Sequence, residues 1–152
     1  GGAGGGTGVL GYSMHSDGRG HDELKCASDS KAVPIATPTP LELSKGGYSP
    51  ITMNGKKVYA FATREVPTVL SEALDASGTD VEGVDHLLLH QANIRIMETV
   101  AKRLGVPMSK VITNLKKYGN TSAGSIPIAL DEAVRDGTVK SGDVIAAAGF
   151  GA

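Results

Sequence analysis

Cysteine, aromatic residues and long apolar runs are all scarce in this sequence. Cys26 is the one cysteine among 152 residues, which excludes an internal disulfide framework and favours a reducing compartment. No apolar run approaches the ~20 residues that a membrane-spanning helix needs, and no signal-peptide pattern opens the chain. A net charge of −1 gives no general attraction to nucleic acid or to anionic membranes. We therefore expect an ordinary globular protein without a nucleic-acid or membrane partner.

The candidate loops also lack the residue clusters of several enzyme classes. The three loops that could form a site, residues 90–93, 119–122 and 149–152, contain no paired carboxylates, no group with metal-ligand spacing and no Ser-His-Asp arrangement. The sequence accordingly predicts no metal site.

Glycine is abundant instead, with 21 residues, and it is concentrated at the start in "GGAGGGTG". The chain closes on "DVIAAAGFGA", in which an apolar strand runs into a glycine turn. Because such a turn usually leads into another element, we expect both ends to be cuts and the sequence to be part of a longer chain.

Apolar periodicity predicts strands and helices in alternation, which is typical of a layered α/β fold. Residues 20–50 show no sustained period and are expected to be mostly loop. The expected elements are a strand at Val9–Met14, a helix over Val58–Leu74, a strand at Val84–Leu89, a helix over Ile94–Leu104, a strand at Val111–Leu115, a helix over Ile126–Val134 and a strand at Asp143–Ala148.

Three polar or glycine-rich loops follow apolar elements, at residues 90–93, 119–122 and 149–152. In α/β folds such loops gather at the sheet edge where ligands bind. Together they would bring an imidazole (His90), a carboxamide (Asn120) and free backbone N–H groups to one place. Those are hydrogen-bond donors of the kind that stabilise an oxyanion or enolate. The alternative is that His90 is merely a satisfied histidine at a strand end.

Three blocks in a fixed order carry a family resemblance: "HQANIRIMETVAKRLGVP", "YGNTSAGSIPIALDEAVRDG" and "GDVIAAAGFGA". They resemble the C-terminal half of β-ketoacyl-acyl-carrier-protein synthase III, a thiolase-fold condensing enzyme, and the ending "FGA" resembles its plastid and cyanobacterial branch. The resemblance implies an α/β fold, a thiolase-like layered α/β/α/β/α sandwich made of two similar halves, with only the second half here. Residues 1–50 would form a glycine-rich strand and an irregular loop, and residues 51–152 the catalytic His/Asn core.

The resemblance also implies roles for individual residues. His90 and Asn120 would donate hydrogen bonds to the malonyl thioester carbonyl while decarboxylation turns it into an enolate. Ala152 stands where the family places an oxyanion-hole N–H, and Phe150 would line the nucleophile's pocket unless it is plain core. Asn93 would contact the pantetheine or coenzyme A chain.

Implied substrates and partners follow from the same likeness. Coenzyme A and phosphopantetheine thioesters would be the substrates, and no cofactor would be needed. Acyl carrier protein would dock on Arg95, Lys102 and Arg103. The alternative is that these charges form only a solvated helix face. The missing N-terminal half would complete the enzyme, which in the family is usually a homodimer of the plastid stroma or bacterial cytoplasm.

The nucleophilic cysteine of the family is not recognisable in this chain. Cys26 lies in the polar context "ELKCASD", which matches no nucleophile motif, so an inert thiol is expected there. The opening "GGAGGG" also lacks the acidic residue of the family's "GDGA" strand. The chain alone should therefore not condense anything. Alternatives are a non-catalytic module that binds coenzyme A or carrier protein, and a fragment of a polyketide synthase-like or hydroxymethylglutaryl-CoA synthase-like enzyme.

Overall fold

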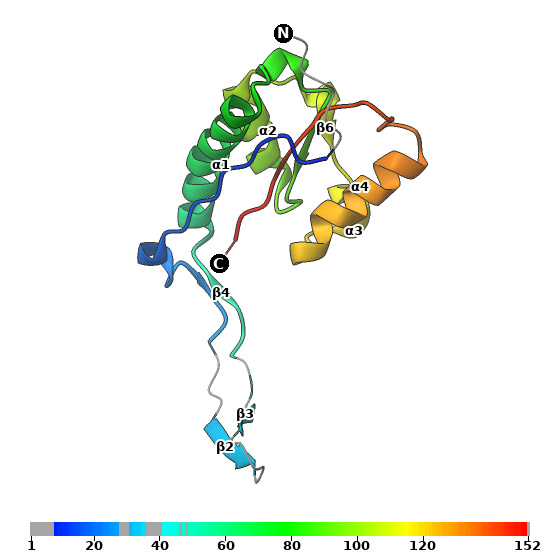
Figure 1. The fold of residues 1–152 in the computed structure, drawn as a ribbon. Helices are drawn as coiled ribbons and strands as arrows, with labels where there is room; N and C mark the ends of the chain where they lie inside the picture. Colours follow the sequence, from blue (N-terminus) through cyan, green and yellow to red (C-terminus); the bar gives the residue numbers. More distant parts are fainter. Residues whose placement is uncertain (1–7, 28–30, 36–40, 46, 48, 152) are drawn as a thin grey trace. The chain divides into compact units, whose positions relative to one another are not determined.

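A computed structural model describes residues 8–27, 31–35, 41–45, 47 and 49–151. Helices and strands alternate through the second half of the chain (Figure 1). In chain order the elements are η1 (Gly18–Gly20), β1 (Leu24–Lys25), β2 (Lys31–Ile35), β3 (Leu41–Lys45), β4 (Thr52–Met53), α1 (Gly55–Ser77), η2 (Val81–Gly83), β5 (His86–Leu89), α2 (Ile94–Leu104), η3 (Met108–Lys110), β6 (Val111–Ile112), α3 (Leu115–Tyr118), η4 (Ser122–Gly124), α4 (Ser125–Arg135) and β7 (Ile145–Ala148).

The chain divides into two compact units. The first contains Gly1–Ser16 and Tyr59–Phe150, and the second contains Asp17–Val58 and Gly151–Ala152. None of the described helices combines the length and the apolar composition that crossing a bilayer requires.

The first unit is built on a three-stranded parallel sheet in the order β6-β5-β7. Its central strand, β5, is apolar on both faces, because Leu87, Leu88 and Leu89 are each at most 1% exposed. A strand of this kind needs a cover on both sides. Replacing one such leucine by alanine typically costs about 2–5 kcal/mol of stability.

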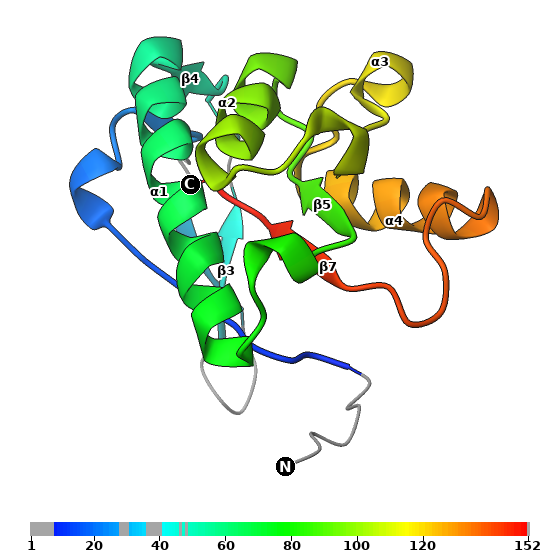
Figure 2. The ribbon, with the colours of Figure 1, turned by 90° about the horizontal axis from the view of Figure 1, so that it is seen from above.

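Helices supply that cover on both faces of the sheet. Leu87 and Leu89 pack in one cluster with buried residues of α1 and α2, such as Leu70 and Met97. Leu88 packs on the opposite face with Ala129 of α4. Figure 2 shows β5 and β7 lying between α2 on one side and α4 on the other. The layered α/β prediction is therefore confirmed.

The helix that follows β5, α2, has the bounds that its sequence predicts. Asn93 caps its amino end, since the carboxamide oxygen accepts a hydrogen bond from the Arg95 N–H at 2.9 Å. Gly105 ends the helix with φ of 74°, a conformation that favours glycine. The predicted helices at α1 and α4 and the strands at β5 and β7 are also confirmed, apart from their end residues.

The strand predicted at Val9–Met14 is wrong, because these residues pair with no strand among the described residues. The segment lies instead against α1, where the Ser13 hydroxyl donates to Glu72 at 2.5 Å. Three of its large apolar side chains face outward: Val9, Tyr12 and Met14 are 86%, 74% and 85% exposed.

The strand predicted at Val111–Leu115 is shorter than expected. It ends at Ile112, and Leu115 already begins the single-turn helix α3.

The second unit corrects the expectation of an irregular segment over residues 20–50. β2 and β3 form an antiparallel ladder that pairs Lys31 with Lys45 and Ile35 with Leu41. β1 and β4 form a second, shorter antiparallel pair. A ladder between strands depends on cross-strand partners rather than on a local period, so the sequence alone shows no sign of it.

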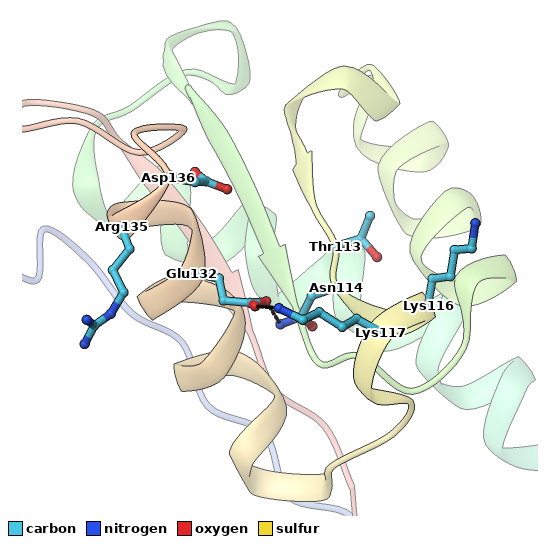
Figure 3. A pocket seen from close by; sticks show the side chains of 7 residues that line it. All are labelled: Thr113, Asn114, Lys116, Lys117, Glu132, Arg135 and Asp136. Carbon is cyan, nitrogen blue, oxygen red and sulfur yellow. Dashed lines mark hydrogen bonds and ion pairs between the residues drawn. The ribbon is translucent and has the colours of Figure 1, made fainter.

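One carboxylate holds the α3 turn onto α4. Glu132 of α4 accepts hydrogen bonds from the Asn114 amide at 2.9 Å, from Lys117 at 2.5 Å and from the Tyr118 hydroxyl at 2.7 Å. Figure 3 shows the Glu132 side chain reaching Asn114 and Lys117 while Arg135 of the same helix points away from them. Because three donors favour its charged form, the pKa of Glu132 falls to about 2. The segment that leads to Asn120 is thereby anchored.

Replacing Gly11 by alanine should lower the free energy of unfolding by about 1–3 kcal/mol, because overpacking forces backbone to move. An added Cβ would lie 2.6 Å from the Ala73 carbonyl oxygen and 2.7 Å from the Ser77 nitrogen of α1. Urea unfolding of the complete protein measures the change. Gly18→Ala is the control, since a Cβ there meets no atom within 4 Å. Equal stability of the two variants would contradict the close approach.

Replacing Glu132 by glutamine should destabilise the protein in a pH-dependent way. A carboxyl whose folded-state pKa is depressed stabilises the fold above its ordinary pKa of 4.5, and that contribution is lost as the pH falls toward about 2. The difference between wild type and Glu132→Gln, measured by urea unfolding, should be largest near neutral pH and shrink in acid. Asp131→Asn is the matched control, because the Asp131 side chain is 58% exposed and pairs with Arg135 within the described residues. A difference that does not vary with pH would rule out this role for Glu132.

Candidate functional site

His90 directly follows β5, and three contacts fix its position. Its backbone N–H donates to the Ala148 carbonyl at 2.9 Å, which continues the pairing of β5 with β7. Its Nδ1 atom lies 2.6 Å from the hydroxyl oxygen of Ser125, the first residue of α4. The Phe150 ring stands edge-on to the imidazole, with centroids 5.1 Å apart and planes at 72°. The imidazole therefore has a defined place and orientation at the sheet edge.

Burial favours the neutral form of this imidazole. The side chain is half-buried, and loss of solvation lowers the pKa of His90 below its ordinary value of 6.5. A neutral ring retains one N–H, so it can donate a hydrogen bond at neutral pH without releasing a proton.

Gln91 joins the ends of two strands through its side chain. It is fully buried, and its amide nitrogen donates to the carbonyls of Leu89 at 2.7 Å and Ile112 at 3.3 Å. Its amide oxygen accepts the Asn114 N–H at 3.2 Å. Its backbone N–H donates to the Ser125 hydroxyl at 3.2 Å. This carboxamide thus ties the loop after β6 to the loop that holds His90.

Asn120 lies between α3 and η4 with its side chain exposed. Its amide oxygen accepts the Ser122 N–H at 2.9 Å. That contact orients the side chain and uses the oxygen, so the NH₂ group is the part available for a ligand. Ser122 has φ of 51° and is the one non-glycine residue in the described part of the chain with a positive φ. Such strain is often found at functional sites.

The topology brings the predicted loops to one edge of the sheet. His90 follows β5, Phe150 follows β7, and the segment that contains Asn120 follows β6; in a parallel sheet these carboxyl ends share an edge. The Ser125 contact further links the His90 loop to the start of α4, five positions after Asn120. No hydrogen bond joins the His90 and Asn120 side chains within the described residues, so their common action on one ligand stays a prediction.

The other predicted pocket residues have different surroundings. Phe150 contacts His90 and also packs against the α1 and α2 cluster, so pocket lining and core packing both apply. Asn93 is exposed, and its oxygen is engaged in capping α2. Ala152 lies outside the described residues.

The three predicted docking residues lie on α2 and are exposed. Arg103 also donates from Nη1 to the Thr63 carbonyl of α1 at 2.8 Å, so it joins the two helices. Lys102 belongs to the last turn, where a cation complements the helix dipole.

Sequence reasoning missed Gln91 and Ser125 as parts of the site. Both are at most 1% exposed although they are polar, and both contact His90 or its neighbour. The only signal in the sequence was their position, one beside His90 and one at the start of a predicted helix.

A depression of about 610 Å³ lies apart from the predicted catalytic residues, none of which lines it. It is lined by Thr113, Asn114, Lys116, Lys117, Glu132, Arg135 and Asp136 (Figure 3). Among the described residues no group of three or more His, Cys, Asp or Glu side chains could hold a metal ion.

Comparison with known proteins agrees with this architecture. Residues 74–152, just over half of the chain, match the family model described as 3-oxoacyl-[acyl-carrier-protein] synthase III C terminal. The chain is 52% identical over 144 residues to a beta-ketoacyl-[acyl-carrier-protein] synthase III of Acaryochloris marina, which covers 95% of this chain and 43% of the relative. The chain is 49% identical over 144 residues to the corresponding protein of Microcystis aeruginosa, and the match again covers 95% of this chain and 43% of the relative.

Among solved structures, a synthase III from Thermus thermophilus superposes with a TM-score of 0.78 and 35% identity. The match covers 94% of this chain and 42% of that one, so the chain spans less than half the length of these relatives. Its mixed α/β architecture is that of the second half of the thiolase-like fold. The chain belongs to the 3-oxoacyl-[acyl-carrier-protein] synthase III family, whose C-terminal part it matches.

Proposed function

We propose that this chain supplies the malonyl-activating part of a condensing enzyme. The enzyme joins malonyl-acyl carrier protein to an acyl-CoA primer in a decarboxylative Claisen condensation, the initiating step of type II fatty acid synthesis. The observation that supports this most is the half-buried imidazole of His90, which Ser125 and Phe150 hold at the sheet edge and whose pKa is lowered by burial.

The mechanism uses hydrogen-bond donors where negative charge develops. The His90 ring N–H and the Asn120 NH₂ group donate to the malonyl thioester carbonyl. The bond between the malonyl α-carbon and the carboxylate breaks and CO₂ leaves. The electron pair of that bond forms an enolate, whose oxygen faces both donors. The enolate carbon then attacks the acyl thioester carbonyl on a cysteine, forming the new carbon–carbon bond and releasing the thiolate.

That cysteine is assigned to a part of the enzyme other than this chain. Cys26 is exposed, and its thiol donates to the Ser49 carbonyl at 3.3 Å. It follows the two-residue strand β1 instead of opening a buried helix, where a thiolate would be stabilised. Without a nucleophile the chain by itself should perform no condensation. The enzyme would be a homodimer in the plastid stroma or the bacterial cytoplasm.

The remaining assignments complete the substrate path. Ala152 donates its N–H to the acyl-cysteine carbonyl, Phe150 lines the pocket beside His90, and Asn93 contacts the pantetheine arm through its NH₂ group, since its oxygen caps α2. The thioesters of coenzyme A and phosphopantetheine are substrates, and the reaction needs no cofactor.

Carrier-protein docking is assigned to α2. Arg95 lies in the first turn, two positions after Asn93, and its side chain is exposed. Lys102 and Arg103 extend the positive charge along the same helix. An acidic carrier protein would be steered by this charge toward the edge where His90 lies.

A non-catalytic module that binds coenzyme A or carrier protein is the second candidate. The exposed basic residues of α2 are compatible with it, but binding alone requires no oriented neutral imidazole. The two readings differ in whether His90 contributes to decarboxylation.

Replacing His90 or Asn120 by alanine in the complete protein should slow malonyl decarboxylation about 10²–10³-fold, because each variant removes one donor from the enolate oxygen. Release of CO₂ from labelled malonyl-carrier protein measures the rate. His86→Gln is the control, since His86 lies at the other end of β5 and contacts Asp143. Unchanged decarboxylation in both alanine variants would leave only the binding-module reading.

Reversing the charge of Arg95 with Arg95→Glu should raise KM for malonyl-carrier protein about tenfold through lost electrostatic steering. The KM for malonyl-CoA should stay the same, because that substrate lacks the acidic protein. Lys140→Glu, a charge reversal in the exposed loop before β7, should affect neither substrate. Equal effects on both substrates would show that Arg95 does not act in docking.

A further inference from the structure

We propose that Ser125 is a positioning residue that sets the tautomer of His90. Its hydroxyl donates a hydrogen bond to Nδ1, so that the single ring proton of the neutral imidazole stays on Nε2. The inference rests on the proposed function for its catalytic meaning, whereas the tautomer itself can be measured without any assay of activity.

The direction of the bond follows from the partners of the Ser125 hydroxyl. This oxygen is buried, since Ser125 is 1% exposed, and it already accepts the Gln91 N–H at 3.2 Å. The hydroxyl proton also needs an acceptor, because buried donors are rarely left unpaired. Within the described residues, Nδ1 of His90 at 2.6 Å is the acceptor that this hydroxyl reaches. If Nδ1 carried the ring proton, the hydroxyl oxygen would accept from both Nδ1 and the Gln91 N–H, and the buried hydroxyl proton would lose this acceptor.

The position of Ser125 in α4 supports the same assignment. It is the first residue of an eleven-residue helix, and the amino end of a helix carries partial positive charge. That charge opposes protonation of the nearby Nδ1 atom. Gln91, fully buried and bonded to β5 and β6, fixes the other side of the hydroxyl. The hydrogen bond from Ser125 to His90 is thus fixed by the start of α4 on one side and by Gln91 on the other.

The tautomer decides what the ring can do in the reaction. With Nδ1 occupied by the hydroxyl proton, Nε2–H is the only ring donor, and Nε2 is the nitrogen away from Ser125. A ring with the opposite tautomer would present a lone pair to the thioester carbonyl and would repel the developing enolate oxygen. Ser125 therefore acts through His90 and contacts no substrate.

The direct test is nitrogen-15 NMR of histidine-labelled complete protein, with the His90 signals assigned by their loss in His90→Gln. A protonated and an unprotonated ring nitrogen have well separated shifts, so the spectrum reports the tautomer. In wild type at a pH above the His90 pKa, we expect an unprotonated Nδ1 and a protonated Nε2. In Ser125→Ala we expect a mixture of tautomers. We also expect a higher His90 pKa, because a hydrogen bond to the neutral form is lost.

The kinetic test compares three variants. Ser125→Ala should lower the rate of malonyl decarboxylation at least roughly tenfold, because part of the population would carry the ring proton on the wrong nitrogen. Ser125→Thr retains the hydroxyl and should recover most of the rate and the wild-type tautomer. Thr63→Val removes another buried hydroxyl, in α1, and should change neither measurement. Circular dichroism checks that each variant is folded.

The outcomes separate this inference from the proposed function. An unchanged tautomer in Ser125→Ala would overturn the role of Ser125 while leaving His90 as a donor. A protonated Nδ1 in wild type would overturn the role of Ser125 and also the assignment of Nε2–H as the donor. Unchanged decarboxylation in His90→Ala would instead overturn the proposed function, whatever the NMR result. The expected tautomer together with loss of activity in Ser125→Ala and its recovery in Ser125→Thr would support both.

Discussion

The burial of β5 on both faces is the constraint on which the rest of the structure depends. Its leucines are locked between α1 and α2 on one side and α4 on the other, so the strand cannot shift without breaking two clusters. Gln91 extends this rigidity beyond the last leucine by bonding to β5, to β6 and to the loop after it. The position of His90 therefore depends on core packing, to which the contacts with Ser125 and Phe150 add the orientation of the ring.

The fold could be predicted where local patterns decide it. α2 has an Asn cap, an apolar stripe and a terminal glycine, and all three can be read without knowing the neighbours. Residues 9–14 and the β2–β3 ladder could not be predicted, because pairing depends on what lies alongside. Gly11 shows the difference: in the sequence it is one glycine among many, whereas in the structure it allows the chain to pass within contact distance of α1.

The site was predictable to a similar degree. The imidazole and the carboxamide follow apolar elements in the sequence, and the parallel sheet places those segments at one edge. The hydroxyl of Ser125 could not be assigned, because a serine at a helix start ordinarily serves the helix itself. Asn93 is the reverse case. An asparagine just before a helix is a common cap, so the sequence itself indicates this role, whereas the family likeness implies a contact with substrate.

The outward-facing Val9, Tyr12 and Met14 have a practical consequence for handling the protein. They lie on a segment that pairs with no strand in the described part of the chain, so their apolar surface is open to solvent. Apolar side chains exposed together in this way favour nonspecific association with other chains. A preparation of this chain alone would consequently be prone to precipitation. Its solubility would rise when another polypeptide covers those three side chains.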